Sequence, residues 1–163
     1  MNRLEFLEKN LERQIGFVRA SETRVQFLLP SLSVAMAAWL AGFLKADFSS
    51  EITVLSGTLA LIGFMISAFF TWQSLYPKID GAQDSNIFFG GIASKTFENF
   101  KQSIENIDSE KYERDLTAQV HINANIALRK FKSVQKAMMF WYISLLPLLL
   151  FLILTLEDIR RGT

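Results

Sequence analysis

The chain of 163 residues has no cysteine and a single histidine, His121. Without cysteine, disulfide bonds and thiolate metal sites are excluded. The sequence HIN at residues 121–123 lacks the spacing of a histidine metal motif, and no phosphate loop of the form GxxxxGK followed by Ser or Thr occurs. Carboxylates alternate with basic residues, as in KYERD at 111–115, which is typical of a solvated helix face. With no converging set of titratable groups, we predict that the protein is not an enzyme.

The chain also has little net charge. It carries 17 Lys and Arg against 16 Asp and Glu, for a formal charge of +1. A protein that binds nucleic acid usually presents a strong basic excess, so we expect no nucleic-acid partner.

Apolar residues make up 50% of the chain and gather in three uncharged stretches, 25–44, 52–77 and 137–156. About 20 helical residues cross a hydrocarbon core of about 30 Å. The third stretch, AMMFWYISLLPLLLFLILTL, has no polar face for water, which argues against three buried helices of a soluble fold. We therefore predict an all-α membrane protein with spans at about 25–44, 52–76 and 137–156.

Basic residues indicate the orientation. Five lie before the first span and nine lie between Gln73 and Lys136, whereas the loop 45–51 holds one and the tail 157–163 holds two. The positive-inside rule then places the N-terminus and the segment 78–136 in the cytoplasm. We therefore expect a multi-pass membrane protein in contact with lipid.

Two of the spans are predicted to continue into a small cytoplasmic helical bundle. Residues 1–24 form an amphipathic helix that runs into the first span, with Pro30 as a possible kink. From Glu110 to Pro147 no glycine or proline interrupts the chain, so the helix after Ser109, its expected N-cap, should run into the third span. We expect 78–136 to be a sensor module, with one amphipathic helix over 91–107 and a loop at residues 80–85. Its small size favours oligomerisation.

Two polar residues interrupt the apolar stripe of the last helix, Asn123 and Lys130. A polar group on such a stripe is costly unless it is paired. Lys130 either snorkels at the bilayer surface, pairs with Glu22, or joins Arg24 and Arg129 around an anionic ligand. On the adjacent face, His121, Asn125 and Lys132 could add hydrogen-bond donors.

The stretch DSNIFFGGIA, residues 84–93, places two phenylalanines before two glycines. One interpretation is packing of Phe88 and Phe89 at a bend where a helix starts. The other is an aromatic wall for a flat ligand beside a closely approaching backbone. The residues alone leave both open.

Taken in order, several short motifs resemble one known family. They are Glu22 and Arg24 at the start of the first span, a membrane hairpin that ends in LYP, then NIFFGGIA, FENF, and DLTAQVHINANIALRKF before the last span. The chain is similar to the transmembrane effectors of bacterial Pycsar antiphage systems. It departs from them in reading Glu22-Thr23-Arg24-Val25 for an Asp-x-Lys-Ala motif, and in Phe131 for a more usual tyrosine.

The resemblance implies an antiphage defence effector of the bacterial inner membrane, and we expect no cofactor. Its ligand is expected to be a cyclic pyrimidine nucleotide, cyclic CMP or cyclic UMP. Binding would make the spans rearrange, or assemble as a homo-oligomer, and disrupt the membrane. The expected result is growth arrest or cell death. Phe88 or Phe89 would stack on the base and Arg129 or Lys130 would meet the phosphate. The predicted ligand-binding residues are Arg24, Asn86, Phe88, Phe89, His121, Asn125, Arg129 and Lys130.

Two other functions stay open at this point. A non-enzymatic membrane scaffold would dock a partner protein and respond to no nucleotide. A small channel or toxin controlled by a protein partner would be toxic on expression alone, although no charge within the spans supports a permanently open ion path.

Overall fold

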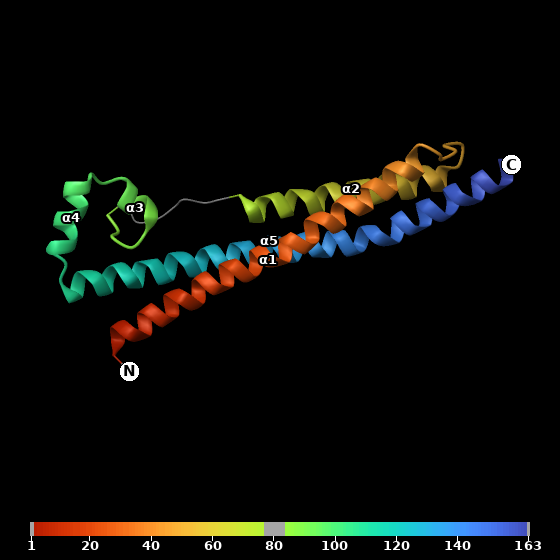
Figure 1. Cartoon of the computed structure of the whole chain (residues 1–163). Coiled ribbons are helices and arrows are strands. Elements are labelled where there is room, and N and C mark those ends of the chain that lie inside the picture. The colour runs from red at the N-terminus through yellow and green to blue at the C-terminus, as the bar shows by residue number, and fades with distance from the viewer. Residues whose placement is uncertain (1, 77–83, 163) are drawn as a thin grey trace. The chain divides into compact units, whose positions relative to one another are not determined.

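The computed structural model describes residues 2–76 and 84–162, and within them every regular element is an α-helix (Figure 1). This confirms the predicted all-α class. The helices are α1 (Arg3–Phe43), α2 (Glu51–Leu75), α3 (Phe89–Ala93), α4 (Phe97–Glu105) and α5 (Ser109–Gly162). Three of them, α1, α2 and α5, are long and apolar enough to cross a membrane.

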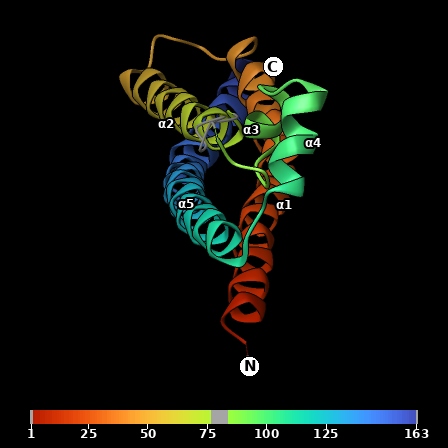
Figure 2. The same ribbon diagram turned by 90° about the vertical axis from the view of Figure 1, so that its left-hand side faces the viewer.

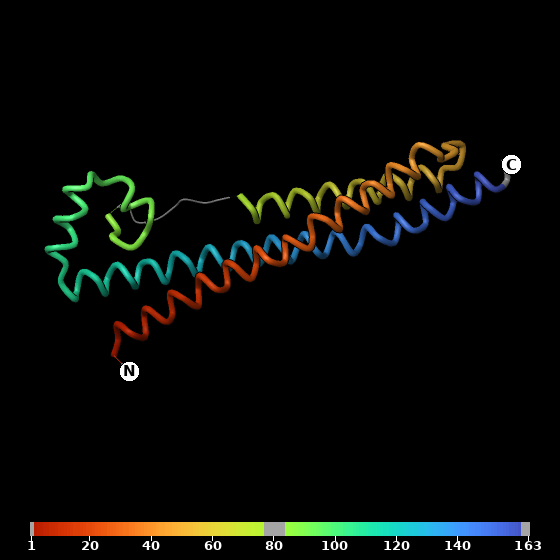
Figure 3. The backbone as a smooth tube through the Cα atoms, viewed as in Figure 1, coloured from red at the N-terminus to blue at the C-terminus, as the bar shows by residue number. Residues whose placement is uncertain are grey.

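The two longest helices, α1 and α5, are each continuous (Figure 3). As predicted, α1 begins before the first apolar stretch and α5 begins well before the third. Pro30 lies inside α1 and Pro147 inside α5. A proline lacks the backbone N–H and so removes one helical hydrogen bond. The helices continue through both prolines because a membrane has no water to satisfy the other backbone groups, which favours the remaining helical hydrogen bonds.

The chain divides into two compact units. The first comprises Met1–Ser21 and Tyr76–Lys130, and the second comprises Glu22–Leu75 and Phe131–Thr163. Both α1 and α5 contribute residues to each unit, because the unit boundaries fall within these helices.

The second unit packs α2 antiparallel to the other two helices (Figure 1). Its apolar core is formed by Leu28, Leu32, Ala35, Ala60, Phe64, Ala137, Leu148 and Phe151. Two hydrogen bonds add to this packing: Trp39 Nε1 donates to the Gly57 carbonyl at 2.8 Å, and Ser67 Oγ donates to the Ala137 carbonyl at 2.7 Å.

Small residues on α2 allow this close approach. A Cβ atom on Gly57 would lie 3.0 Å from the ring of Phe151, and one on Gly63 would overlap Ser144 Oγ. Small residues at helix contacts are the usual solution in lipid, where the hydrophobic effect does not drive helices together. Gly57 and Gly63 therefore allow α2 to pack closely against Phe151 and Ser144 of α5.

In the first unit the expected single helix over 91–107 is wrong. The structure has two short helices, α3 and α4, separated by Ser94–Thr96 (Figure 2). The Thr96 side chain caps α4 by accepting the Asn99 N–H at 3.2 Å. Lys95, between the helices, turns its ammonium group to Asn86. The apolar spacing of this segment is helical, but capping and a tertiary contact decide where it breaks.

The cap of α5 also differs from the prediction. Ser109 is already the first helical residue, and Asp108 Oδ1 accepts the Lys111 N–H at 2.7 Å. Asp108 is therefore the N-cap, which suits a carboxylate at the positive end of a helix. The stripe predicted on α5 from Leu116 to Ala137 is confirmed, since its members are buried or half-buried.

Candidate ligand site

The loop before α3 is held by one buried serine. Ser85 is 3% exposed, and its Oγ accepts the backbone N–H groups of Ile87 at 3.0 Å and Phe88 at 2.8 Å. The same oxygen accepts from Nε2 of Gln119 on α5, which is 2% exposed, at 3.2 Å. A buried hydroxyl with three donors around it fixes the loop against α5.

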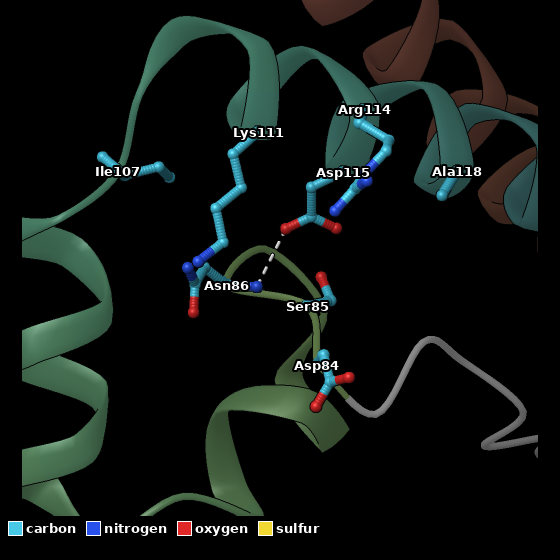
Figure 4. A pocket seen from close by; sticks show the side chains of 8 residues that line it. All are labelled: Asp84, Ser85, Asn86, Ile107, Lys111, Arg114, Asp115 and Ala118. Carbon is cyan, nitrogen blue, oxygen red and sulfur yellow. Dashed lines mark hydrogen bonds between the residues drawn. The ribbon is translucent and has the colours of Figure 1, made fainter.

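Asn86 joins three segments of the first unit. Its backbone N–H donates to Asp115 Oδ2 on α5 at 2.8 Å, as the dashed line in Figure 4 shows. Its side-chain Oδ1 accepts from Lys95 Nζ at 2.6 Å and from Ser103 Oγ on α4 at 2.9 Å. Asn86, predicted to bind ligand, thus uses its amide oxygen and its N–H in holding the loop.

This loop and the start of α5 enclose a hollow of about 170 Å³. Its lining residues are Asp84, Ser85, Asn86, Ile107, Lys111, Arg114, Asp115 and Ala118 (Figure 4). Lys111 extends toward the side chain of Asn86 (Figure 4). A second hollow of about 220 Å³ is lined by Asp108, Glu110, Lys111 and Arg114. Lys111 and Arg114 thus belong to the lining of both hollows.

Lys111 and Arg114 are the two basic residues that line the first hollow, beside the carboxylates of Asp84 and Asp115. Asp115 is engaged by Asn86, and Glu113 pairs with Arg3 Nε at 2.7 Å. Lys111 and Arg114 form no ion pair with another side chain in the described part of the chain. Both are exposed, so an anion can reach them from solvent. A guanidinium can bind phosphate through two parallel hydrogen bonds.

The interpretation of KYERD as a simply solvated face is therefore incomplete. Tyr112 is half-buried, and its hydroxyl donates to Glu8 Oε1 on α1 at 2.9 Å. Burial, followed by the hydrogen bond to Glu8, raises the pKa of Tyr112 above its ordinary value. The phenol remains a hydrogen-bond donor throughout the physiological pH range.

Phe88, the N-cap of α3, and Phe89, its first residue, have different surroundings. Their ring centroids are 4.6 Å apart. Phe88 is half-buried and its ring covers Gly90, where an added Cβ would lie 2.5 Å from Phe88 Cε1. Phe89 is 66% exposed. Phe88 therefore packs on Gly90, whereas the ring of Phe89 is open to solvent.

The predicted residues of α5 lie along that helix within the first unit. His121, Asn125 and Arg129 are exposed at a spacing of one turn, and Asn125 Nδ2 donates to the His121 carbonyl at 3.0 Å. Lys130 is half-buried. Arg24 belongs to the second unit, where its guanidinium lies 5.0 Å from the ring centroid of Phe131. A cation over an aromatic ring is a favourable contact.

Sequence reasoning did not single out the residues that build the hollow, namely Ser85, Lys95, Lys111, Arg114, Asp115 and Gln119. Lys111 and Arg114 carried one available signal, their spacing of one helical turn just after an N-cap. That signal is weak, because most such pairs are solvated. Only the contact between residues 84–86 and the first turns of α5 shows that this pair lines a hollow.

Comparison with known proteins gives one family match that covers most of the chain. Residues 6–156 match the PycTM family, described as the Pycsar effector protein domain. A stretch of 62 residues is 37% identical to "Pycsar effector protein GmPycTM" from Gulbenkiania mobilis and covers 38% of this chain. The match spans 32% of that protein, about a third of its length. No solved structure matches the chain.

Proposed function

This chain belongs to the Pycsar effector protein family, and on that basis we propose that it is an antiphage defence effector that is triggered by a cyclic nucleotide and then disrupts the bacterial inner membrane. The expected triggers are cyclic CMP and cyclic UMP. The result is growth arrest or death of the infected cell. The protein acts by rearranging within the membrane and not as an enzyme.

The three candidate spans support the membrane part of this proposal. The distribution of Lys and Arg favours a cytoplasmic N-terminus and a cytoplasmic segment between α2 and the third span. In that orientation the first unit meets nucleotides made inside the cell.

The observation that carries the ligand site is the hollow between residues 84–86 and the start of α5. Lys111 and Arg114 supply two positive charges for a cyclic phosphate, and the exposed ring of Phe89 supplies a surface on which a base can stack. The residues predicted on α5, His121, Asn125, Arg129 and Lys130, are a second anion-binding surface within the same unit.

Helix continuity supports the link from binding to the membrane. Lys111 and Arg114 stand on the first turns of α5, and the same helix provides the third candidate span. To move a two-state equilibrium from mostly inactive to mostly active, a ligand must favour the active state by about 5.5 kcal/mol. Several contacts, or assembly of several protomers, are needed to supply that difference.

Calorimetric titration of the detergent-solubilised protein tests the site. Cyclic CMP, UMP, AMP and GMP are compared on the parent chain, Arg114→Gln, Arg129→Gln and the control Lys101→Gln. Lys101 is an exposed residue of α4 whose Nζ lies 3.8 Å from Glu105. Losing one charge-assisted phosphate contact costs about 1.5–3 kcal/mol, which weakens binding by about tenfold or more.

We expect a pyrimidine nucleotide to bind, Arg114→Gln to weaken it, and Lys101→Gln to leave it unchanged. A loss in Arg129→Gln alone would move the phosphate to the second surface of α5. Absence of binding by all four nucleotides to folded protein would refute triggering by these four and favour the scaffold or an untested nucleotide.

A further inference from the structure

Hydroxyl side chains lie toward both ends of the side of α2 that is buried in the second unit, and Gly57, Ala60 and Phe64 lie between the two groups. The hydroxyl-bearing residues are Thr53, Ser56, Ser67, Thr71 and Ser74, and each is at most 3% exposed. On α5 the buried hydroxyls of the same unit are Ser133, Ser144 and Thr155. We call these eight residues the hydroxyl seam. The exposed side of α2 is apolar, with Ile62, Met65 and Phe69 among its members.

Most of the seam does not hold the helices together. Ser56, Thr71, Ser144 and Thr155 each donate to a carbonyl three or four residues earlier in their own helix. Two members do join helices: Ser67 donates to the Ala137 carbonyl, and Ser133 donates to Gln73 Oε1 at 3.0 Å. Apolar residues of similar size could pack at the other positions without polar atoms to satisfy.

The two ends of the α2 seam hold hydroxyls with no partner. Thr53 Oγ1 and Ser74 Oγ are buried without a hydrogen bond, and each residue is 1% exposed. Along a straight helix these positions are about 32 Å apart, close to the thickness of a hydrocarbon core. Burying a hydroxyl without a partner is unfavourable, and water in contact with the seam would remove that cost.

We propose that α2 lines a water-filled path through the membrane in the active state, opened when the three spans separate along the hydroxyl seam. Water then bonds the hydroxyls of α2, while its apolar side stays in lipid. The seam carries no charge, so the path admits hydrated ions and small polar solutes without strong selection by sign. This inference rests on the proposed function, because the nucleotide supplies the trigger.

The absence of native cysteine makes a direct test possible. Single variants Ser67→Cys and Ser74→Cys place a thiol in the seam, and Met65→Cys, at a residue 60% exposed, places one on the apolar side as a matched control. Each is reconstituted into dye-loaded phospholipid vesicles with cyclic CMP or cyclic UMP. A charged, membrane-impermeant methanethiosulfonate reports hydration, because a thiol reacts as its thiolate.

We expect the nucleotide that releases dye to speed modification at Ser67→Cys and Ser74→Cys by about tenfold or more, since a dry thiol stays protonated. Modification should also reduce dye release, whereas Met65→Cys should react slowly throughout. A variant counts as folded when its vesicles stay sealed without nucleotide and release dye with nucleotide before modification.

Three results would overturn the inference. Dye release with both seam cysteines unmodified would leave the proposed function standing and place the path elsewhere. Equal modification of Met65→Cys and the seam would indicate general disruption of the bilayer. No release with either nucleotide would refute the proposed trigger and this inference together.

Discussion

Single residues show how the start of α3 is packed. Gly90 is needed because the ring of Phe88 occupies the space where a Cβ would stand. This packing turns Phe88 onto its own backbone, while Phe89 stays exposed. Two identical neighbouring side chains thus differ in their surroundings, one packed against the backbone and the other exposed to solvent.

Gly90→Ala should therefore destabilise the protein by about 1–3 kcal/mol, the usual cost of overpacking. Gly16→Ala is the matched control, since Gly16 lies inside α1 and no atom is within 4 Å of its added Cβ. That change should stabilise by up to about 1 kcal/mol, because alanine favours the helix. Thermal unfolding in detergent measures both. An equal effect of the two substitutions would contradict the packing role of Phe88.

At the scale of elements, α2 carries most of its hydroxyl groups on the side that is buried in the second unit. Its buried side carries mostly small and hydroxyl-bearing residues together with Phe64, and most of its other large apolar residues are exposed. A helix of a soluble protein would bury its large apolar residues away from water. In a bilayer these residues can face the lipid instead. Small residues are then left for helix contacts.

Two serines on that side should respond differently to removal of the hydroxyl. Ser67→Ala loses the hydrogen bond to the Ala137 carbonyl, and such bonds between membrane helices average about 0.6 kcal/mol, with a maximum near 1.7. Ser74→Ala removes a hydroxyl that has no partner, so its effect should be near zero or stabilising. Unfolding of both variants in mixed micelles measures the difference. A larger loss for Ser74→Ala would show that its hydroxyl is satisfied.

For the whole molecule, the proposed function predicts a conditional effect on cells. Expression of the chain alone should be tolerated. Expression together with an enzyme that makes cyclic CMP or cyclic UMP should collapse the membrane potential and stop growth. A potential-sensitive dye follows the response over time, and an inactive variant of the nucleotide-forming enzyme is the control.

The same experiment separates the competing functions. A scaffold that docks a partner protein predicts no change in potential with any nucleotide. A toxin held back by a protein partner predicts loss of growth on expression of this chain alone. Arg114→Gln should raise the amount of nucleotide needed for the response by the same factor by which it weakens binding.

Much of this protein follows from local properties of its sequence. The length and hydropathy of three stretches determine the candidate spans, because crossing a bilayer depends on consecutive apolar residues. The long interval without glycine or proline between Glu110 and Pro147 determines the continuity of α5. The order of short motifs was enough to indicate the family that residues 6–156 match.

Tertiary structure decided what depends on distant residues. Asn86 meets Asp115 across 29 positions of the chain, which makes Lys111 and Arg114 part of a hollow. The break between α3 and α4 follows from the Thr96 cap and the reach of Lys95 to Asn86, against an apolar spacing that favours one helix. Hydropathy also cannot show which side of α2 is buried, because lipid accepts large apolar side chains as readily as a protein core does. Packing of small residues against α5 makes that choice.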